Sequence, residues 1–477
     1  MRPPRIPAGA PWALVVVVSL VACRRDRARS TRGDASVAAA PPAYALEVKE
    51  LPPIDLGPAR GAWSTRPYDR EFQVQPTRDG GLVAFEPWWR SWDDRDRPDE
   101  GRIEMWKFDD AGHERWSLTV RAEPDVAQIF GGNMVVAGDS IWVLIDGTGR
   151  IELDGRSIDI GEGDATAVSL LRFSSATGAV LGHRTFSATE GVGGGPMIAL
   201  DEGILIFVKA TSATGESEWY TPGYEGHLVR IDGAGLTLWT LGVDQWSDGA
   251  LLVADESQIA IADDKSIPHR IGGREVPDIE QWDGWHAFIS HDGHLTGVGP
   301  LELPAGSLGS FVLSQGRPFY TASAVATANG RPDGDGMRSY DPPIGLYDPY
   351  VDYDGGKFDI VIPPGPRQAS ALIIETAAGR RRTILRHDDA CASPAILPVF
   401  DGMFFLCAGR IELRDALGEV LSRTPISLTG DTVWTFGMRD HIILVTRTWT
   451  GPDQRRMRVF KISMLPRTGP TPRQGAP

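Results

Sequence analysis

The feature that most constrains this chain is a ten-residue segment that occurs twice at distant positions. "KFDDAGHERW" covers residues 107–116, and "RIDGAGLTLW" covers residues 230–239. Both segments place an aspartate, a glycine and a tryptophan at the same relative positions, as in a strand end, a polar turn and a second strand. A chain that repeats a hairpin over such a distance is predicted to consist of repeated units that pack against their neighbours.

Similar turn-and-strand segments occur throughout the chain. A polar or glycine-containing turn precedes a short apolar strand eight times, near residues 79, 138, 201, 255, 314, 354, 401 and 439. No long stretch has apolar residues at the helical period. One such unit cannot bury both faces of its sheet, whereas a closed ring of units can. We therefore expect an all-β fold, a single β-propeller of eight (alternatively seven) four-stranded blades, with the two ten-residue segments as the outer hairpins of blades one and three.

The two ends of the repeat region bear on how the ring closes. The last unit ends without a fourth strand, which "ALEVKEL" (45–51) or "REFQVQP" (70–76) could supply. The fifth unit is degenerate, and it decides between seven and eight blades. The body resembles secreted bacterial β-propeller repeat proteins and quinoprotein-like propellers, which use a similar D-x-x-G-x-x-x-W turn. Quinoprotein dehydrogenases usually carry adjacent cysteines over their cofactor, and this chain has none, so we expect no cofactor.

The N-terminal residues resemble an export signal. Two arginines precede an apolar run that is too short to span a membrane, and Leu20-Val21-Ala22-Cys23 resembles the lipobox of bacterial lipoproteins. We expect a lipoprotein signal peptide over 1–22 and an acylated Cys23; the alternative is a secreted protein in which Cys23 is incidental. Arg24, and not an aspartate, follows the cysteine, which resembles the pattern of outer-membrane sorting. The sequence leaves open whether the protein would face the periplasm or the cell surface.

The segments that flank the body have the composition of linkers. We expect a flexible Ala/Pro/Arg tether after the lipidated cysteine over 23–61, the propeller over 62–465 and a disordered tail over 466–477. With Cys23 lipidated, Cys391 and Cys407 remain, and they are expected to form a disulfide; two buried free thiols are the alternative.

Charge and motifs exclude several classes of function. Lys and Arg number 48 against 63 Asp and Glu, for a net charge of −15, which argues against a nucleic-acid partner. The sequence has no nucleophile elbow, no zinc-protease motif and no phosphate-binding loop. Two turns hold potential metal ligands, but solvated turns explain both equally well, so we expect no metal and no catalytic residues; the turns carry His286, His291 and His294 for zinc, and Asp333, Asp335 and Asp341 for calcium.

Long insertions suggest where function lies. They occupy 88–101, 211–226, 278–285 and 339–355, between the second and third strands of the early units. Such connections should emerge on one face of the ring and bring together an aromatic rim that acts as a set of binding anchors. Packing between blades is the alternative for each ring, and the candidates are Trp88, Trp89, Trp92, Trp219, Tyr220, Tyr224, Trp282, Trp285, Tyr340 and Tyr347.

These patterns favour a non-catalytic binding or scaffold module that is anchored by lipid in the cell envelope. Its partner would be a protein, peptide or glycan of the envelope, bound on the long-loop face, and membrane contact would be made by the lipid alone. The alternative is an envelope enzyme, a hydrolase or lyase, with its site at the central channel.

The lipid attachment is directly testable. Mass spectrometry of the mature N-terminus should show an acylated Cys23 with residues 1–22 removed, because the lipobox directs modification of the cysteine before cleavage. A Cys23→Ser variant should lose both processing and membrane association. Cleavage at another position, or a membrane-bound Cys23→Ser protein, would contradict the prediction.

Overall fold

A computed structural model describes residues 44–57, 72–88, 101–123, 128–153, 155–161, 166–188, 191–201, 203–210, 218–245, 250–264, 268–276, 284–301, 307–314, 316–325, 368–375, 381–383, 395–399, 402–407, 410–415, 420–426, 432–437, 441–451 and 454–466. Within these ranges the regular structure is entirely β, without a helix. The described strands form seven separate antiparallel sheets.

The sheets run from an inner to an outer strand in chain order, except that sheet 7 takes its outer strand from the N-terminal end of the described chain. Sheet 1 contains β3 (Gln73–Pro76), β4 (Leu82–Trp88), β5 (Arg102–Phe108) and β6 (Glu114–Ala122). Sheet 2 contains β7 (Gln128–Ala137), β8 (Ser140–Thr148), β11 (Ala167–Ser174) and β12 (Val180–Phe186). Sheet 3 contains β13 (Gly193–Leu200), β14 (Gly203–Lys209), β15 (Gly226–Ile231) and β16 (Thr237–Val243). Sheet 4 contains β17 (Leu251–Ala254), β18 (Ile259–Asp263), β21 (Gly284–Ile289) and β22 (Leu295–Leu301).

The remaining three sheets follow the same order. Sheet 5 contains β23 (Ser307–Ser314), β24 (Arg317–Val325), β25 (Gln368–Glu375) and β26 (Arg381–Thr383). Sheet 6 contains β27 (Ala395–Val399), β28 (Gly402–Cys407), β29 (Arg410–Asp415) and β30 (Val420–Pro425). Sheet 7 contains β31 (Thr432–Gly437), β32 (His441–Gly451), β33 (Gln454–Pro466) and β1 (Tyr44–Glu50), and β2 (Ile54–Gly57) also pairs with β33.

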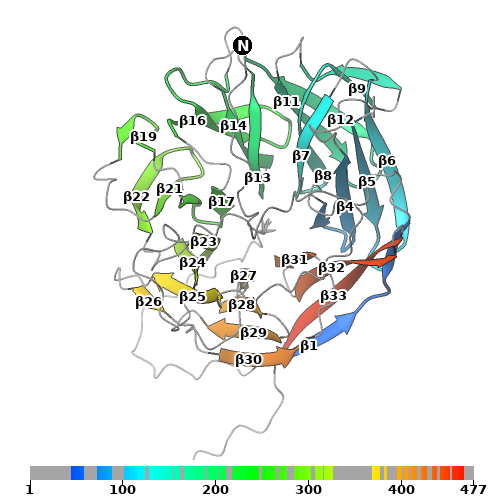
Figure 1. Ribbon diagram of the computed structural model, residues 1–477, viewed down its shortest axis with the longest axis vertical. Helices are drawn as coiled ribbons and strands as arrows, with labels where there is room; N and C mark the ends of the chain where they lie inside the picture. Colours follow the sequence, from blue (N-terminus) through cyan, green and yellow to red (C-terminus); the bar gives the residue numbers. More distant parts are fainter. Residues whose placement is uncertain are drawn as a thin grey trace, which may run out of the picture.

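The sheets are arranged radially as a ring (Figure 1). The inner strands contact one another in sequence from β3 through β7, β13, β17, β23 and β27 to β31, and β31 contacts β3 again. Radially arranged antiparallel sheets around a closed circle of inner strands are the architecture of a β-propeller. The expected fold class is therefore confirmed.

An N-terminal strand closes the ring. β1 pairs antiparallel with β33, from Tyr44↔Pro466 to Glu50↔Phe460, and the two strands lie side by side in Figure 1. The first of the two predicted closing segments, 45–51, therefore supplies the fourth strand. The predicted tether over 23–61 needs correction, because residues 44–57 belong to the ring; backbone pairing with an otherwise open edge holds them there.

Eight blades were expected, but no eighth sheet occurs among the described strands. The expected extra unit begins near residue 354, which lies outside the described residues. β24 pairs directly with β25 from Phe319↔Ile374 to Val325↔Gln368, so 326–367 connects the second and third strands of a single sheet. The hairpins assigned to the fifth and sixth units are thus combined in sheet 5.

The apolar core lies between the sheets. One cluster joins sheets 1 and 2 through Phe85 and Ile141, and another joins sheets 2 and 3 through Leu144 and Ile206. Similar clusters join sheets 3 and 4, 4 and 5, 6 and 7, and 7 and 1. Most described second strands are buried along most of their length because neighbouring sheets cover both of their faces.

The two ten-residue segments are the outer hairpins of sheets 1 and 3, as predicted, and they tie neighbouring sheets together. In sheet 1, the carboxylate of Asp109 accepts hydrogen bonds from the backbone amides of Ala111 and His113, and this fixes the turn. Trp116 packs on Gly178 of sheet 2, and its Nε1 donates to the carbonyl of Ser175 at 3.2 Å.

Sheet 3 repeats this arrangement toward sheet 4. Trp239 packs on Gly293, and its Nε1 donates to the carbonyl of His291 at 2.8 Å. Gly293 has a φ of 83°, a left-handed conformation that favours glycine, and a Cβ there would lie 2.7 Å from the Trp239 ring. The D-x-x-G-x-x-x-W segment is therefore a connector between sheets as well as a turn.

Two hairpins reinforce the same pairs of sheets. The connection from β8 to β11 contains β9 (Arg150–Leu153) and β10 (Arg156–Asp159), and β9 pairs with β6 of sheet 1. The connection from β18 to β21 contains β19 (Arg270–Ile271) and β20 (Arg274–Glu275), and β19 pairs with β16 of sheet 3. Sheets 1 and 2 thus form one tied pair and sheets 3 and 4 a second. The ten-residue segment therefore recurs after two sheets, once in each tied pair.

The tryptophan contact should contribute measurably to stability. Trp116→Ala should lower the free energy of unfolding by about 1–3 kcal/mol, less than the loss for a fully buried ring, because the indole is only partly buried. Trp116→Phe keeps a ring but removes the N–H donor, and it should cost about 1 kcal/mol. Denaturant unfolding of these variants and of the exposed control Leu238→Ala would test this; equal stability of all three would contradict it.

Candidate functional site

The two faces of the ring differ in their connections. The face where first-to-second and third-to-fourth strand turns lie, here called the turn face, has tight turns closed by backbone hydrogen bonds, such as Gly112 N to Asp109 O and Gly235 N to Asp232 O. The opposite face, here called the insertion face, receives the connections between second and third strands. Sheets 1 to 5 have long ones, between β4 and β5, β8 and β11, β14 and β15, β18 and β21, and β24 and β25.

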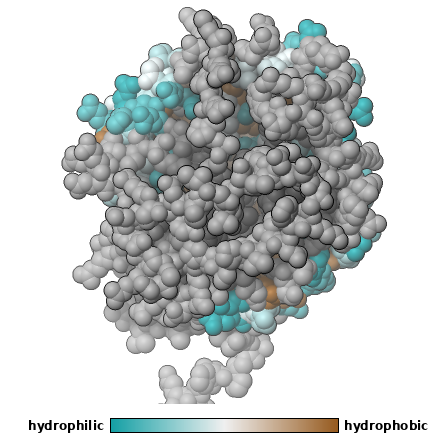
Figure 2. All heavy atoms as spheres, viewed as in Figure 1, coloured by the Kyte–Doolittle hydropathy of each residue, from teal (hydrophilic) through white to brown (hydrophobic). Residues whose placement is uncertain are grey.

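This distribution confirms that the predicted insertions lie between second and third strands. One insertion was missed, the connection that contains β9 and β10. Its sequence signal was "LDG" (153–155), a turn of the type that also opens other hairpins. In Figure 2, the described residues visible at the rim of the ring are mainly hydrophilic, with small hydrophobic spots between them.

Three of the predicted rim aromatics are buried packing residues. Trp285 lies within β21 with no exposed surface, between sheets 3 and 4. Trp219 is 4% exposed and meets Phe186 of sheet 2 edge-on, with ring centroids 5.5 Å apart. Tyr224 is also buried. The expectation of exposed anchors is wrong for these three residues, because the core between sheets takes up their apolar surface.

Tyr224 and Tyr220 fix an insertion in place. The Tyr224 hydroxyl accepts a hydrogen bond from the amide of Gly273 at 2.8 Å, and the Arg270 guanidinium lies over its ring at 4.4 Å. Tyr220 is half-buried, with its ring 4.8 Å from that of the buried His227. These contacts hold residues 218–225 against sheets 3 and 4 and leave little ring surface for a ligand.

The other predicted site residues fall at or beyond the limits of the described chain. Trp88 is the last residue of β4 and pairs with Arg102, at the insertion face. Cys407 ends β28. The residues outside the described ranges are Cys23, Trp89, Trp92, Trp282, Asp333, Asp335, Tyr340, Asp341, Tyr347 and Cys391.

Buried ionisable side chains, which the sequence reasoning missed, lie near the insertion face. Glu86 and Glu104 face each other across β4 and β5, and both are buried. Arg102 approaches Glu104, with Nε 3.4 Å from Oε1. The available signal was a charged residue within an apolar strand, as in "VAFEP". Two facing buried carboxylates with a nearby guanidinium are a group that can hold and transfer a proton.

Other charged groups at this face are paired within the ring. The fully buried Glu412 forms ion pairs with Arg410 at 3.0 Å and Arg423 at 2.7 Å. Arg447 lies over the ring of Phe72 at 4.9 Å, so it contacts both sheets 7 and 1. Such buried charges need partners, because desolvation of an unpaired charge is costly.

Polar groups on the inner strands join neighbouring sheets. Gln73 of β3 donates through Nε2 to Oδ1 of Asn133 on β7 at 3.0 Å, and Asn133 donates through Nδ2 to the carbonyl of Gly195 on β13 at 3.0 Å. These amides are committed to the ring itself. Within the described ranges no group of three or more metal-ligating side chains is found, so His286, His291 and His294 do not converge there.

On the turn face, a buried lysine is neutralised by a turn carboxylate. Lys107 Nζ lies 2.6 Å from Asp79 Oδ1 and also donates to Thr77 Oγ1. Partial burial acts to raise the pKa of Asp79, but hydrogen bonds from Lys107, Thr77 and the Gly81 amide outweigh it and lower the pKa to about 2. This pair is a structural contact between strands β4 and β5, remote from the insertions.

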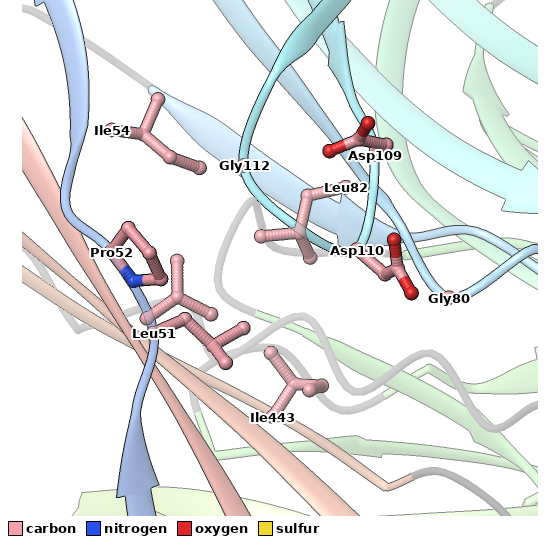
Figure 3. Close-up of a pocket in the computed structure, with 10 residues that line it drawn as sticks. Leu51, Pro52, Ile54, Gly80, Leu82, Asp109, Asp110, Gly112 and Ile443 are labelled. Carbon is pink, nitrogen blue, oxygen red and sulfur yellow. The ribbon is translucent and has the colours of Figure 1, made fainter.

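Figure 3 shows a cleft on the turn face where β1 and β2 meet sheets 7 and 1. Leu51, Ile54 and Ile443 lie on one side of it, and Leu82 and Asp109 lie across from them. The Asp109 carboxylate already accepts hydrogen bonds from its own turn. The cleft therefore marks the closing contact of the ring more than a polar binding site.

Comparison with known proteins leaves the activity unassigned. No family model matches the chain, and no curated protein matches it. Among solved structures, virginiamycin B lyase from Staphylococcus aureus is 10% identical with a TM-score of 0.42, over 88% of this chain and 100% of that chain. The N-terminal domain of Nup159 is 10% identical with a TM-score of 0.40, over 88% and 96%. An α-L-arabinanase from Penicillium chrysogenum is 11% identical with a TM-score of 0.37, over 88% and 98%.

These likenesses are too distant to transfer an activity, and the three proteins have unrelated functions. A search for membrane-spanning helices in the described ranges found none that is sufficiently long and apolar. The site must therefore be argued from this chain's own residues.

His227 should make stability depend on pH. Burial lowers its pKa, although hydrogen bonds to the backbone at Thr221 and Val208 oppose the shift. Because the folded pKa lies below the unfolded value of about 6.5, the unfolded chain binds more protons, and stability falls as pH drops below about 6.5.

Urea unfolding at pH 7.5 and pH 5.5 measures this effect. The loss of stability between the two values should be smaller in His227→Phe, which keeps a ring against Trp219 and Tyr220. An equal pH dependence in His227→Phe and the wild-type protein would contradict the assignment.

Proposed function

We propose that this protein is a lipid-anchored β-propeller of the bacterial cell envelope that binds a protein, peptide or glycan through its insertion face and acts as a non-catalytic scaffold. The observation that carries the proposal is the contrast between the two faces: tight, hydrogen-bonded turns on one and long connections in sheets 1 to 5 on the other. Loops held by a rigid scaffold are a common location of binding sites.

The anchor fits the geometry of ring closure. The proposed lipid at Cys23 would leave residues 24–43 as the tether, since β1 begins at Tyr44. Fully extended, that segment spans at most roughly 70 Å, enough to hold the ring near an outer-membrane surface. The anchor and the envelope location rest on the lipobox-like sequence.

A ring of seven blades is the form that we propose. The seven sheets of the described strands and the closed circle of inner-strand contacts support it. It requires that 326–367 contribute no blade of its own, which the direct pairing of β24 with β25 favours.

Deletion of residues 326–367 tests the blade number. Val325 and Gln368 are paired neighbours, so a short Asn-Gly turn can join β24 to β25. The shortened protein should fold with a thermal midpoint close to that of the full chain. Loss of cooperative unfolding would indicate that the deleted segment supplies a blade.

An enzyme with a site at the central channel is the second candidate, and the facing pair Glu86 and Glu104 favours it. A hydrolase or lyase would use such a pair as acid and base. Glu86→Gln and Glu104→Gln should then abolish turnover of an envelope glycan or peptide while the protein stays folded. In a binding module, both variants should leave partner capture unchanged.

The binding proposal predicts a separation between capture and stability. Trp88→Ala combined with Trp89→Ala should abolish retention of the envelope partner with little change in thermal midpoint, because anchors at a strand end and in a loop contribute to binding more than to the core. Trp219→Ala should instead cost about 3–5 kcal/mol of stability, because its ring is buried between sheets.

Quantitative capture from envelope extracts, with Leu181→Ala on the outer strand β12 as an exposed control, measures the first effect. Full retention by the double variant would overturn the insertion face as the binding surface. Unfolding of the double variant would show that these rings pack between sheets.

A further inference from the structure

One position in the outer strand is equivalent in sheets 1 to 4, and Ser422 occupies it in sheet 6. It faces the third-strand residue that precedes the β-bulge, and its register partners are Lys107, Arg172, Arg230 and Phe288. The occupants alternate around the ring as Trp116, Gly182, Trp239 and Gly297. Each tryptophan covers the turn of the next sheet, so Gly182 leaves the turn of sheet 3 without this aromatic cover.

The seam between sheets 2 and 3 shows the consequence. Within the described chain, no atom lies within 4 Å of a Cβ built on Gly182 or on Gly235, the turn glycine of sheet 3. At the equivalent turn glycines, Gly178 and Gly293, a built Cβ would lie 3.1 and 2.7 Å from the rings of Trp116 and Trp239. The structure thus has an open space at the place where an indole packs in the two tied seams.

Two exposed leucines belong to the hairpin that carries Gly235. Leu236 is 66% exposed and Leu238 is 57% exposed. Between them, Thr237 accepts a hydrogen bond from Arg184 of sheet 2 at 2.6 Å, which brings the outer strands together beside the gap. Gly182, Gly235, Leu236 and Leu238 are called the Gly182 notch below. Large apolar side chains left exposed beside an open space are typical of an interaction site.

A hydrogen-bond acceptor is available where an indole would need one. The backbone carbonyls of Ser175 and His291 accept hydrogen bonds from Trp116 and Trp239, respectively. Each of these two residues directly follows the residue whose backbone amide closes the turn, which is Ser174 in sheet 2 and Ser290 in sheet 4. In sheet 3 the closing amide belongs to Asp232, so the equivalent carbonyl is that of Gly233. No hydrogen bond to this carbonyl is found in the described part of the chain.

We propose that the Gly182 notch binds the side chain of a tryptophan on a segment of a partner protein. The occupant is argued from the molecule itself: the notch continues the row of contacts between sheets in which an indole packs on a turn glycine and donates to a turn carbonyl. The partner's tryptophan would occupy the space that a tryptophan at position 182 of this chain would fill. This surface lies toward the turn face, so it is independent of the proposed insertion-face site.

Ligand-observed NMR with N-acetyl-tryptophanamide and the peptide acetyl-GSGWGSG-amide tests the proposal on the mature protein. Both probes should show saturation transfer with wild-type protein and with Gly182→Ala, because the alanine Cβ enters open space. Gly182→Trp should lose the signal and unfold at a higher temperature, because its own ring then covers Gly235. Tighter binding of N-acetyl-tryptophanamide than of the peptide would overturn a partner segment as the occupant.

A second variant guards against misfolding of Gly182→Trp. Leu238→Asp changes an exposed side chain, so the ring should stay folded while the signal of both probes is lost. Undiminished binding to either folded variant, or no binding to wild-type protein at millimolar probe, would refute the Gly182 notch as an indole site.

Discussion

Every sheet in this protein needs a neighbour on each face. A four-stranded antiparallel sheet presents apolar side chains on both sides, and it can bury both only between two similar sheets. The clusters that join Phe85 to Ile141 and Leu144 to Ile206 show this sharing directly. A row of such sheets would leave its two ends exposed, so the fold depends on closure, and the pairing of Tyr44–Glu50 with β33 makes that closure part of the hydrogen-bonded ladder.

The contacts that tie neighbouring sheets together repeat with a period of two sheets. Trp116 and the β9–β10 hairpin tie sheet 1 to sheet 2, and Trp239 and the β19–β20 hairpin tie sheet 3 to sheet 4. The intervening seam has neither device and relies on its apolar core, the Arg184–Thr237 hydrogen bond and the amides of the inner strands. Neighbouring seams of one ring can therefore differ in what they leave open at the rim, although their cores are built alike.

The two faces of the ring have different physical tasks. On the turn face, aspartate-capped turns and the Lys107–Asp79 pair use their polar groups within the fold. At the insertion face, charged groups such as Glu86 and Glu104 are carried near strand ends beside a long connection. Charges retained in buried positions near loops are costly to a fold, and they are more informative about function than the exposed carboxylates that dominate the net charge.

The sequence by itself determined the class of fold, the repeat and the position of the insertions, because turn glycines and alternating strands are local signals. The ten-residue segments identified the outer hairpins of sheets 1 and 3, and "ALEVKEL" was recognised as a possible closing strand. Only the tertiary structure decided that Trp219, Tyr224 and Trp285 are buried, since a ring's exposure depends on which sheet packs over it. It also decided that the hairpins on either side of 326–367 belong to one sheet, because strand pairing across a long connection leaves no local trace. Identification of the Gly182 notch required both sources of information. The repeat defined the equivalent position, and the packing showed that the space is open in this seam.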